Sequence, residues 1–150
     1  LYWFPSSVAA TIEEAFERYV FPKFYSEYEA AQAFEEFMEV LHRAERGDLK
    51  PVYEIRLINP ATTRPETIYE IKTHWNNSKR SEKTSGYLGA RLFHGEPAAK
   101  KDSVICVQLF CKTEYQEDED GWLDQSGAAR RAAFRYDECR RSRWAKLVAI

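Results

Sequence analysis

The sequence is poor in cysteine, with three cysteines among its 150 residues. So small and odd a set is no disulfide framework, which excludes a disulfide-stabilised secreted domain and favours a reducing compartment. No apolar run approaches the roughly 18 residues that a membrane span needs. The N-terminus also lacks a basic region followed by an apolar core. We therefore expect a cytoplasmic protein with no signal peptide and no membrane partner.

Recognisable catalytic and binding motifs are missing as well. The chain has no GxGxxG, GxxxxGKS/T, GxSxG or HExxH pattern and no EF-hand loop. His42, His74 and His94 fall on separate predicted elements. Cys106 and Cys111 are five residues apart in one predicted strand, so we expect them on opposite faces, reduced, and unable to share a metal ion. The sequence thus predicts no metal site and no cofactor.

The chain does have the material for one core. Hydrophobic residues make up 44% of it and aromatic residues 15%, whereas 22 basic residues nearly balance 24 acidic ones. A balanced chain with this apolar content is not a disordered polyelectrolyte. The length suits one domain, and no linker, repeat or low-complexity tract divides it, so we expect a single domain over residues 1–150.

Two helices are predicted near the N-terminus. Apolar residues recur at helical spacing over residues 8–22, where Ser6 or Ser7 is the expected N-cap. A second helix should begin at Ser26, which forms a capping-box pattern with Glu29, and should stop at Gly47. The side chains expected to pack from this helix onto a sheet are Phe34, Phe37 and Leu41.

Beyond residue 50 the periodicity changes to that of strands. The predicted strands cover residues 53–57, 67–75, 87–94 and 103–112. The last of these is the most apolar, so Ile105, Val107 and Leu109 should be buried in a central strand. A basic helix is expected over residues 126–144. The fold class is therefore α+β, with two N-terminal helices packed on a four-stranded antiparallel sheet and a basic C-terminal helix.

Charge is segregated along the chain. Residues 1–47 sum to −5, residues 72–101 to +5, residues 102–127 to −6 and residues 128–150 to +5. If the two basic blocks meet in space they form a cationic face for a polyanion. Alternatively, each basic block neutralises an acidic one, for example through pairing of the arginine-rich last helix with the acidic second helix.

The polar residues around the predicted sheet have the chemistry needed to bind and cleave RNA. Lysine and arginine can hold a phosphodiester and stabilise its transition state, and an imidazole or phenol can move a proton. An aromatic ring can stack an unpaired base. The candidate catalytic residues are Arg91, Lys112, Arg135, Tyr115 and His74. The candidate RNA-binding residues are Lys79, Arg80, Lys83, Trp75 and Arg131.

Four short segments also carry a family resemblance. They are Tyr53–Leu57, Ala90–Phe93, Val104–Glu114 and Ala132–Arg135. In this order they resemble the RelE/ParE/HigB superfamily of toxins from toxin–antitoxin modules. The resemblance implies two helices against a curved antiparallel sheet with a closing helix. Members similar to RelE and HigB cut messenger RNA on the ribosome without a metal, whereas members similar to ParE poison DNA gyrase.

The resemblance also implies site residues and partners. The basic sheet residues of the family would fall on Arg91 and Lys112, its terminal-helix arginine on Arg135, and its phenols on Tyr115 or Tyr136. RNA or the ribosome would be the target, with a cognate antitoxin as partner. The chain departs from the family in being about half again as long, in having only Leu1–Phe4 for a first strand, and in residues 58–86, which have no counterpart.

Three functions follow as hypotheses. The first is a toxin-like, metal-independent RNA endonuclease with a cationic sheet face. The second is a non-enzymatic interaction domain, such as an immunity protein, an antitoxin-like partner or a binding module of the NTF2 or cystatin type, which would present its acidic segments to a basic partner. The third is a nucleic-acid binder without catalysis, for which binding would depend steeply on salt while the substrate stays intact.

Overall fold

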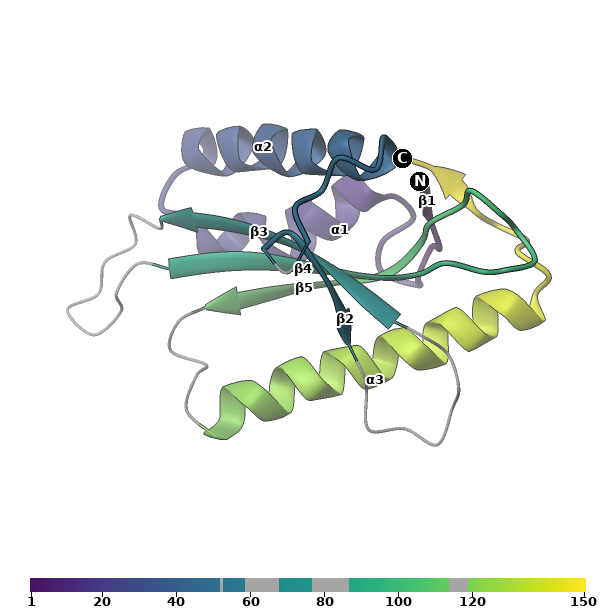
Figure 1. Cartoon of the computed structure of the whole chain (residues 1–150). Coiled ribbons are helices and arrows are strands. Elements are labelled where there is room, and N and C mark those ends of the chain that lie inside the picture. The colour runs from purple at the N-terminus through teal and green to yellow at the C-terminus, as the bar shows by residue number, and fades with distance from the viewer. Residues whose placement is uncertain (52, 59–67, 77–86, 114–118) are drawn as a thin grey trace.

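The protein is an α+β structure in which helices cover both faces of one sheet. The computed structural model describes residues 1–51, 53–58, 68–76, 87–113 and 119–150. Helices α1 (Ile12–Tyr19) and α2 (Glu27–Glu45) lie on one side of the sheet, and α3 (Glu119–Arg141) lies on the other (Figure 1). The sheet therefore separates the acidic α2 from the arginine-rich α3, so these two helices do not neutralise one another.

The first helix is shorter than predicted. It begins after Thr11, whose Oγ1 accepts a hydrogen bond from the Glu14 backbone N–H at 3.3 Å. The expected N-cap was wrong, because the Ser6 hydroxyl instead accepts from the backbone N–H groups of Val8 and Ala9 in a preceding turn. A short 3-10 turn, Phe21–Lys23, follows the helix.

The second helix matches its prediction at both ends. The Ser26 hydroxyl accepts from the Glu29 backbone N–H at 3.2 Å, and α2 runs from Glu27 to Glu45. Gly47 then adopts a φ of +75°, a left-handed conformation that glycine takes at little cost and that ends the helix. Phe37 and Leu41 are buried against the sheet as expected, and Phe34 packs beside them.

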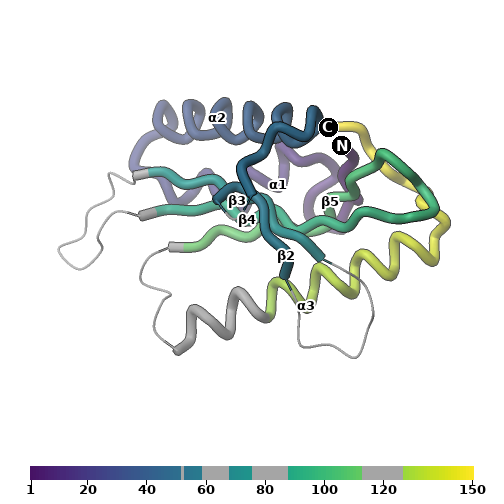
Figure 2. Tube along the Cα trace, viewed as in Figure 1, coloured from purple at the N-terminus to yellow at the C-terminus, as the bar shows by residue number. Residues whose placement is uncertain are grey.

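The sheet has six strands where four were predicted. They are β1 (Tyr2–Trp3), β2 (Ile55–Ile58), β3 (Ile68–Asn76), β4 (Tyr87–Gly95), β5 (Ile105–Thr113) and β6 (Val148–Ala149). Their spatial order is β2-β3-β4-β5-β1-β6, and β1 is parallel to β5 while the other pairs are antiparallel. The prediction of a purely antiparallel sheet was thus wrong, because two-residue strands carry no periodic pattern. β1 and β6 bring the two termini side by side (Figure 2), where the Ile150 backbone N–H donates to the Leu1 carbonyl at 3.2 Å.

The edge strand β2 is shifted from its predicted position. Tyr53 and Leu57, which the alternation assigned to the buried face, are 75% and 58% exposed. Ile55 and Ile58 are half-buried instead. An edge strand with one neighbour buries little of either face, so its alternation predicted the wrong side.

The central strand β5 contains a bulge that changes which side chains face which layer. Its register with β4 shifts after Phe93, so Val107 is an extra residue. As a result Cys106 and Cys111 both face the α1/α2 layer, and the prediction of opposite faces was wrong. Burial raises the pKa of both thiols to about 12. Both are free of disulfides, as is Cys139.

Two apolar cores result, one on each face. The core below α1 and α2 contains Phe16, Phe37 and Leu109, whereas the core above α3 contains Phe93 and alanines of the helix. Ile105, Val107 and Leu109 are at most 1% exposed, which confirms their predicted burial. In the part of the chain that the structure describes, no helix is both long and apolar enough to cross a membrane.

The last helix starts and stops earlier than the predicted range of 126–144. It begins at Glu119 and ends at Arg141. Arg143, Trp144 and Lys146 have φ values of 56°, 63° and 69°, which a right-handed helix cannot contain. The chain turns there and returns to the sheet as β6.

Candidate nucleic-acid interface

One end of the sheet face that α3 covers is polar and basic. Lys72 and His74 of β3 share this face with Arg91 of β4 and Lys112 of β5, because Lys72 pairs with Arg91 and Gly89 lies between His74 and Lys112 in the register. We call these four side chains the cationic strip. The predicted residues Arg91, Lys112 and His74 are therefore brought together, and Lys72 joins them.

Gly89 makes room at the centre of the strip. A Cβ atom at this position would lie 3.2 Å from a terminal guanidinium nitrogen of Arg91 and 3.4 Å from Nδ1 of His74. The imidazole and the guanidinium thus approach over the same glycine. A larger side chain here would push them apart, so Gly89 belongs to the geometry of the strip although it contributes no functional group.

A buried carboxylate orients Arg91. Arg91 is 6% exposed, and its Nε lies 4.0 Å from Oε2 of Glu70, which is fully buried. The other oxygen of Glu70, Oε1, forms an ion pair with Nε of Arg56 on the edge strand β2. A guanidinium buried beside a carboxylate is held in place, because each charge compensates the desolvation of the other. Arg91 and Arg56 therefore share one buried carboxylate, that of Glu70.

The electrostatic field at His74 is positive. Burial, and then the neighbouring charges of Arg91, Lys72 and Lys112, together lower the pKa of His74 from 6.5 to about 4. The pKa of Lys72 is also lowered, first by burial and then by Arg56, although Glu70 opposes this. His74 is thus neutral at pH 7, with an imidazole able to accept a proton beside three cationic groups.

Arg135 has a different role from the one predicted for it. Its Nε donates to the Val107 carbonyl, and one terminal nitrogen donates to the carbonyls of Phe4 and Pro5 at 2.6 and 3.1 Å. The guanidinium carbon also lies 5.4 Å from the centre of the Phe4 ring. These contacts fasten α3 to β5 and to the segment after β1, so Arg135 is engaged by the backbone and not by the strip.

The remaining predicted residues are not gathered at the strip. Trp75 points to the opposite face, where its ring packs edge-on against Phe16 and Phe24. Arg131 is exposed on α3. Tyr136 is buried below Gly95. The predictions for Tyr115, Lys79, Arg80 and Lys83 lie outside the described residues.

The histidines do not form a metal centre in the described parts of the chain. His74 belongs to the face of α3, whereas His94 faces the α2 side, pairs with Cys106 and stacks on Tyr69 with ring centres 5.5 Å apart. No group of three metal-binding side chains occurs among the residues that are described.

Sequence reasoning missed Lys72, Glu70 and Gly89. The first two alternate with Ile71 in the predicted strand and therefore looked like solvated residues of an exposed face. Glu70 and Lys72 lie on the same sheet face as Arg91 only because of how β3 pairs with β4, and this register cannot be read from the sequence of either strand alone. One signal could have identified Lys72: it lies two residues before His74, on the same predicted polar face of the strand.

Comparison of the chain with protein-family models, with curated proteins and with solved structures gives no match. The resemblance to the RelE/ParE/HigB superfamily accordingly stays a prediction from the sequence, and a functional proposal is built on the geometry of the cationic strip.

Proposed function

We propose that this protein is a toxin-like endonuclease that binds RNA on the cationic strip and cleaves it without a metal ion. The observation that supports this most is the neutral imidazole of His74 beside Arg91, Lys72 and Lys112 on one sheet face. A phosphodiester needs cations to bind and to stabilise its transition state, and a 2′-hydroxyl needs a base.

The proposed reaction gives His74 the role of the base and gives Arg91 and Lys112 the role of stabilising charge. The His74 imidazole takes the proton of a ribose 2′-hydroxyl, the 2′-oxygen bonds to phosphorus, and the bond from phosphorus to the 5′-oxygen breaks. The leaving oxygen takes a proton from water, so the products are a 2′,3′-cyclic phosphate and a 5′-hydroxyl end. Arg91 and Lys112 stabilise the added charge on the phosphoryl oxygens. The arriving phosphate also offsets the positive field, which raises the pKa of His74 and makes it a stronger base.

The order of elements lends support to the family assignment within this proposal. A short strand, β1, precedes α1 and α2, as the resemblance requires of Leu1–Phe4. The helices are followed by β2 to β5, and α3 then packs against the sheet before the short final strand β6. The ribosome as target, a cognate antitoxin as partner and a cytoplasmic location belong to the same proposal.

The test is cleavage of an RNA oligonucleotide by the full chain in the presence of EDTA. We expect products ending in a 2′,3′-cyclic phosphate, identified by mass spectrometry, and no cleavage where a single 2′-deoxynucleotide replaces the ribose at the cut site. His74→Gln should abolish cleavage and leave binding nearly unchanged. Lys112→Ala should weaken binding and lower the slope of log affinity against log salt by about 0.7, the value for one lost phosphate contact on a single strand.

Lys101→Ala is the matched control, because Lys101 is exposed in the connection between β4 and β5. It should leave cleavage and the salt slope unchanged. If the RNA stays intact while its affinity keeps the expected dependence on salt, the protein is a non-catalytic RNA binder and not an endonuclease. Cleavage that persists in His74→Gln would show that His74 is not the base.

A further inference from the structure

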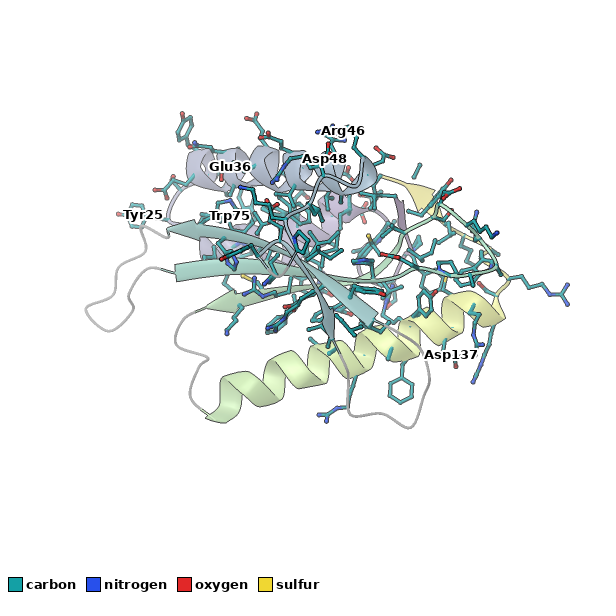
Figure 3. The ribbon with its side chains drawn as sticks, in the orientation of Figure 1. Tyr25, Glu36, Arg46, Asp48, Trp75 and Asp137 are labelled. Atoms are coloured by element: carbon teal, nitrogen blue, oxygen red, sulfur yellow. The ribbon has the colours of Figure 1, made fainter. Side chains whose placement is uncertain are left out.

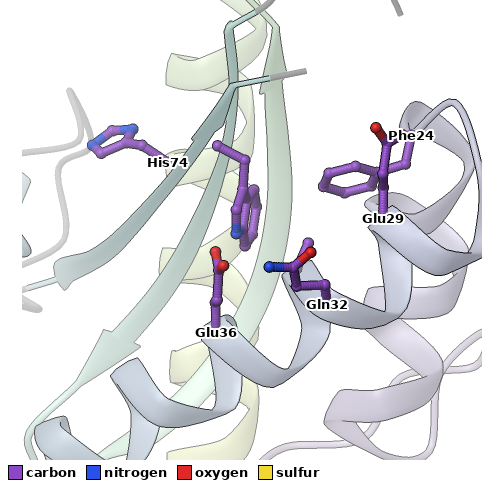
Figure 4. A pocket seen from close by; sticks show the side chains of 7 residues that line it. Phe24, Glu29, Gln32, Glu36 and His74 are labelled. Atoms are coloured by element: carbon purple, nitrogen blue, oxygen red, sulfur yellow. The ribbon is translucent and has the colours of Figure 1, made fainter. Parts of the chain in front are cut away.

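The opposite face of β3 carries a second, acidic hollow that the proposed function does not use. It holds about 310 Å³ and lies where α2 faces β3. Its lining residues are Phe24, Glu29, Gln32, Ala33, Glu36, His74 and Trp75. Figure 4 shows Glu36 and Gln32 reaching from α2 toward this space, with Phe24 and Glu29 at its other side, whereas the His74 imidazole points away from it.

The charge of the hollow selects a cation. Glu29 and Glu36 line it from positions two turns apart on α2, and its lining contains no lysine or arginine in the described structure. Glu27, Glu35 and Glu39 lie on the same helix and are exposed, so the surrounding potential is negative. A phosphate or other anion is repelled here, while an ammonium or guanidinium group gains charge-assisted hydrogen bonds to the carboxylates.

A second observation points independently to a ligand. Trp75 is 8% exposed, and its Nε1–H has no hydrogen-bond acceptor among the described residues. Its ring is fixed by edge-on contacts to Phe16 and Phe24, with ring centres 6.0 and 5.7 Å away. A buried donor without an acceptor destabilises the folded state, so buried indole N–H groups usually have a hydrogen-bond partner. A ligand for this hollow therefore carries an acceptor as well as a cation.

We propose that the hollow binds a lysine or arginine residue in a peptide segment of a partner protein. The side-chain cation is held by Glu36, and its methylene stem lies against the ring of Phe24. The backbone carbonyl of the same segment accepts the hydrogen bond of the Trp75 indole. A basic peptide supplies both the cation and the neutral acceptor. Figure 3 shows Trp75 below Glu36 of α2, away from Arg46 and Asp48, which follow the C-terminal end of the helix.

The test uses the full chain labelled with ¹⁵N and the peptides acetyl-Ala-Arg-Ala-amide and acetyl-Ala-citrulline-Ala-amide. The citrulline peptide keeps the shape and the carbonyl groups but has no charge. We expect the arginine peptide to shift the Trp75 indole N–H signal saturably and to bind at least about tenfold more tightly, because its hydrogen bonds to carboxylates are charge-assisted. Equal binding of the two peptides, or no shift with either, overturns the proposal.

Three variants separate binding from folding. Glu36→Gln should weaken the arginine peptide about fivefold or more, whereas Glu35→Gln, which removes the same charge from an exposed neighbour outside the hollow, should change the affinity by less than about twofold. Trp75→Phe keeps an aromatic ring but removes the unpaired donor and part of the indole, so it should weaken the peptide. Because Trp75 packs in the core, the melting temperature should also fall, and the affinity is therefore measured at a temperature where the variant is folded. A short single-stranded RNA that shifts the Trp75 signal in place of the peptide would also overturn the proposal. Peptide binding should persist in Lys112→Ala even where RNA cleavage is lost, because Lys112 does not line the hollow and the imidazole of His74, which borders it, points away from it. Loss of peptide binding in this variant would overturn the proposal of a separate site.

Discussion

The two faces of the sheet are built from different side chains: one face is an apolar core and the other is partly a polar, basic surface. On the α1/α2 face, large residues interlock: the ring of Phe16 lies 5.1 Å from that of Phe34, 5.3 Å from that of Phe37 and 6.0 Å from that of Trp75. On the α3 face, the helix contributes small residues, namely Ala128, Ala129, Ala132 and Ala133, over part of the sheet. The rest of that face is the cationic strip.

The difference shows how one sheet supports both stability and a polar site. Interlocked aromatic residues bury a large apolar area, so the α1/α2 face can carry most of the folding free energy. Alanines let α3 approach the sheet closely while covering only one end of it. The polar end then holds buried charges, which cost stability wherever they are not compensated. Four substitutions test this comparison.

The largest effect is expected on the α1/α2 face. Leu109→Ala should lower the free energy of unfolding by about 2–5 kcal/mol, because Leu109 is 1% exposed and its removal leaves a cavity. Leu57→Ala is the same change at a residue that is 58% exposed, and it should cost less than about 0.5 kcal/mol. Urea unfolding of both variants measures the difference. A small loss for Leu109→Ala would mean that this face does not carry the stability.

Most of the fold follows from patterns in the sequence, and the errors have physical causes. α2 was predicted at both ends because Ser26 and Gly47 act through local backbone geometry. The burial of Leu109 followed from the apolar character of its strand. The parallel strand β1 and the bulge at Val107 were missed, because both depend on pairing between segments far apart in the sequence.

The candidate site was predicted in part. Arg91, Lys112 and His74 were named from their chemistry, and the register of β3, β4 and β5 places them on one face. Arg135 was named for the same chemistry but has three backbone carbonyls as partners. The sequence shows that Arg135 is a cation with several donors. Whether those donors bind a phosphate or backbone carbonyls depends on where α3 packs on the sheet, which the sequence does not show.

The next effect probes how closely α3 approaches the sheet. A Cβ atom on Gly95 would lie 2.3 to 2.8 Å from three ring atoms of Tyr136, which is itself buried. Gly95→Ala should therefore lower the free energy of unfolding by about 3 kcal/mol, the upper end for overpacking. Gly89→Ala is the matched control for stability, because the nearest atoms to its Cβ would lie 3.2 to 3.5 Å away, where only a small adjustment of Arg91 is needed. Equal losses in thermal unfolding would contradict the close approach.

Arg135 should contribute to stability and not to RNA affinity. Arg135→Ala leaves the carbonyls of Val107, Phe4 and Pro5 without this donor, and we expect a loss of about 2 kcal/mol. Arg131→Ala removes an exposed arginine from the same helix and should change stability by less than about 0.5 kcal/mol. RNA affinity of the folded Arg135→Ala protein should match that of Arg131→Ala. If Arg135→Ala binds RNA more weakly than Arg131→Ala does, Arg135 takes part in RNA binding after all.

The smallest effect concerns the polar end of the α3 face and is seen as a pH dependence. The pKa of His74 is lowered from 6.5 to about 4, chiefly by burial and then by Arg91 and Lys72. Between these two pH values the unfolded chain takes up a proton that the folded protein does not. Stability from this group is therefore fully present above pH 6.5 and is lost as the pH falls toward 4. His74→Gln removes this proton uptake, so its stability should change less over that interval.

Urea unfolding of both proteins from pH 7 to pH 4 measures the difference. We expect it to be modest, because the side chain of His74 is only partly desolvated and its surface remains open to solvent, which screens the charges around it. Glu54, whose pKa is lowered by its bond to Arg43, loses its contribution only below about its ordinary value of 4.5, so it does not produce the same slope. Inorganic phosphate bound at the strip should raise the pKa of His74 and flatten the wild-type curve, because it offsets the cations that repel the proton. Parallel curves for wild type and His74→Gln would mean that the positive field does not act on this imidazole, and the strip would then lose its proposed base.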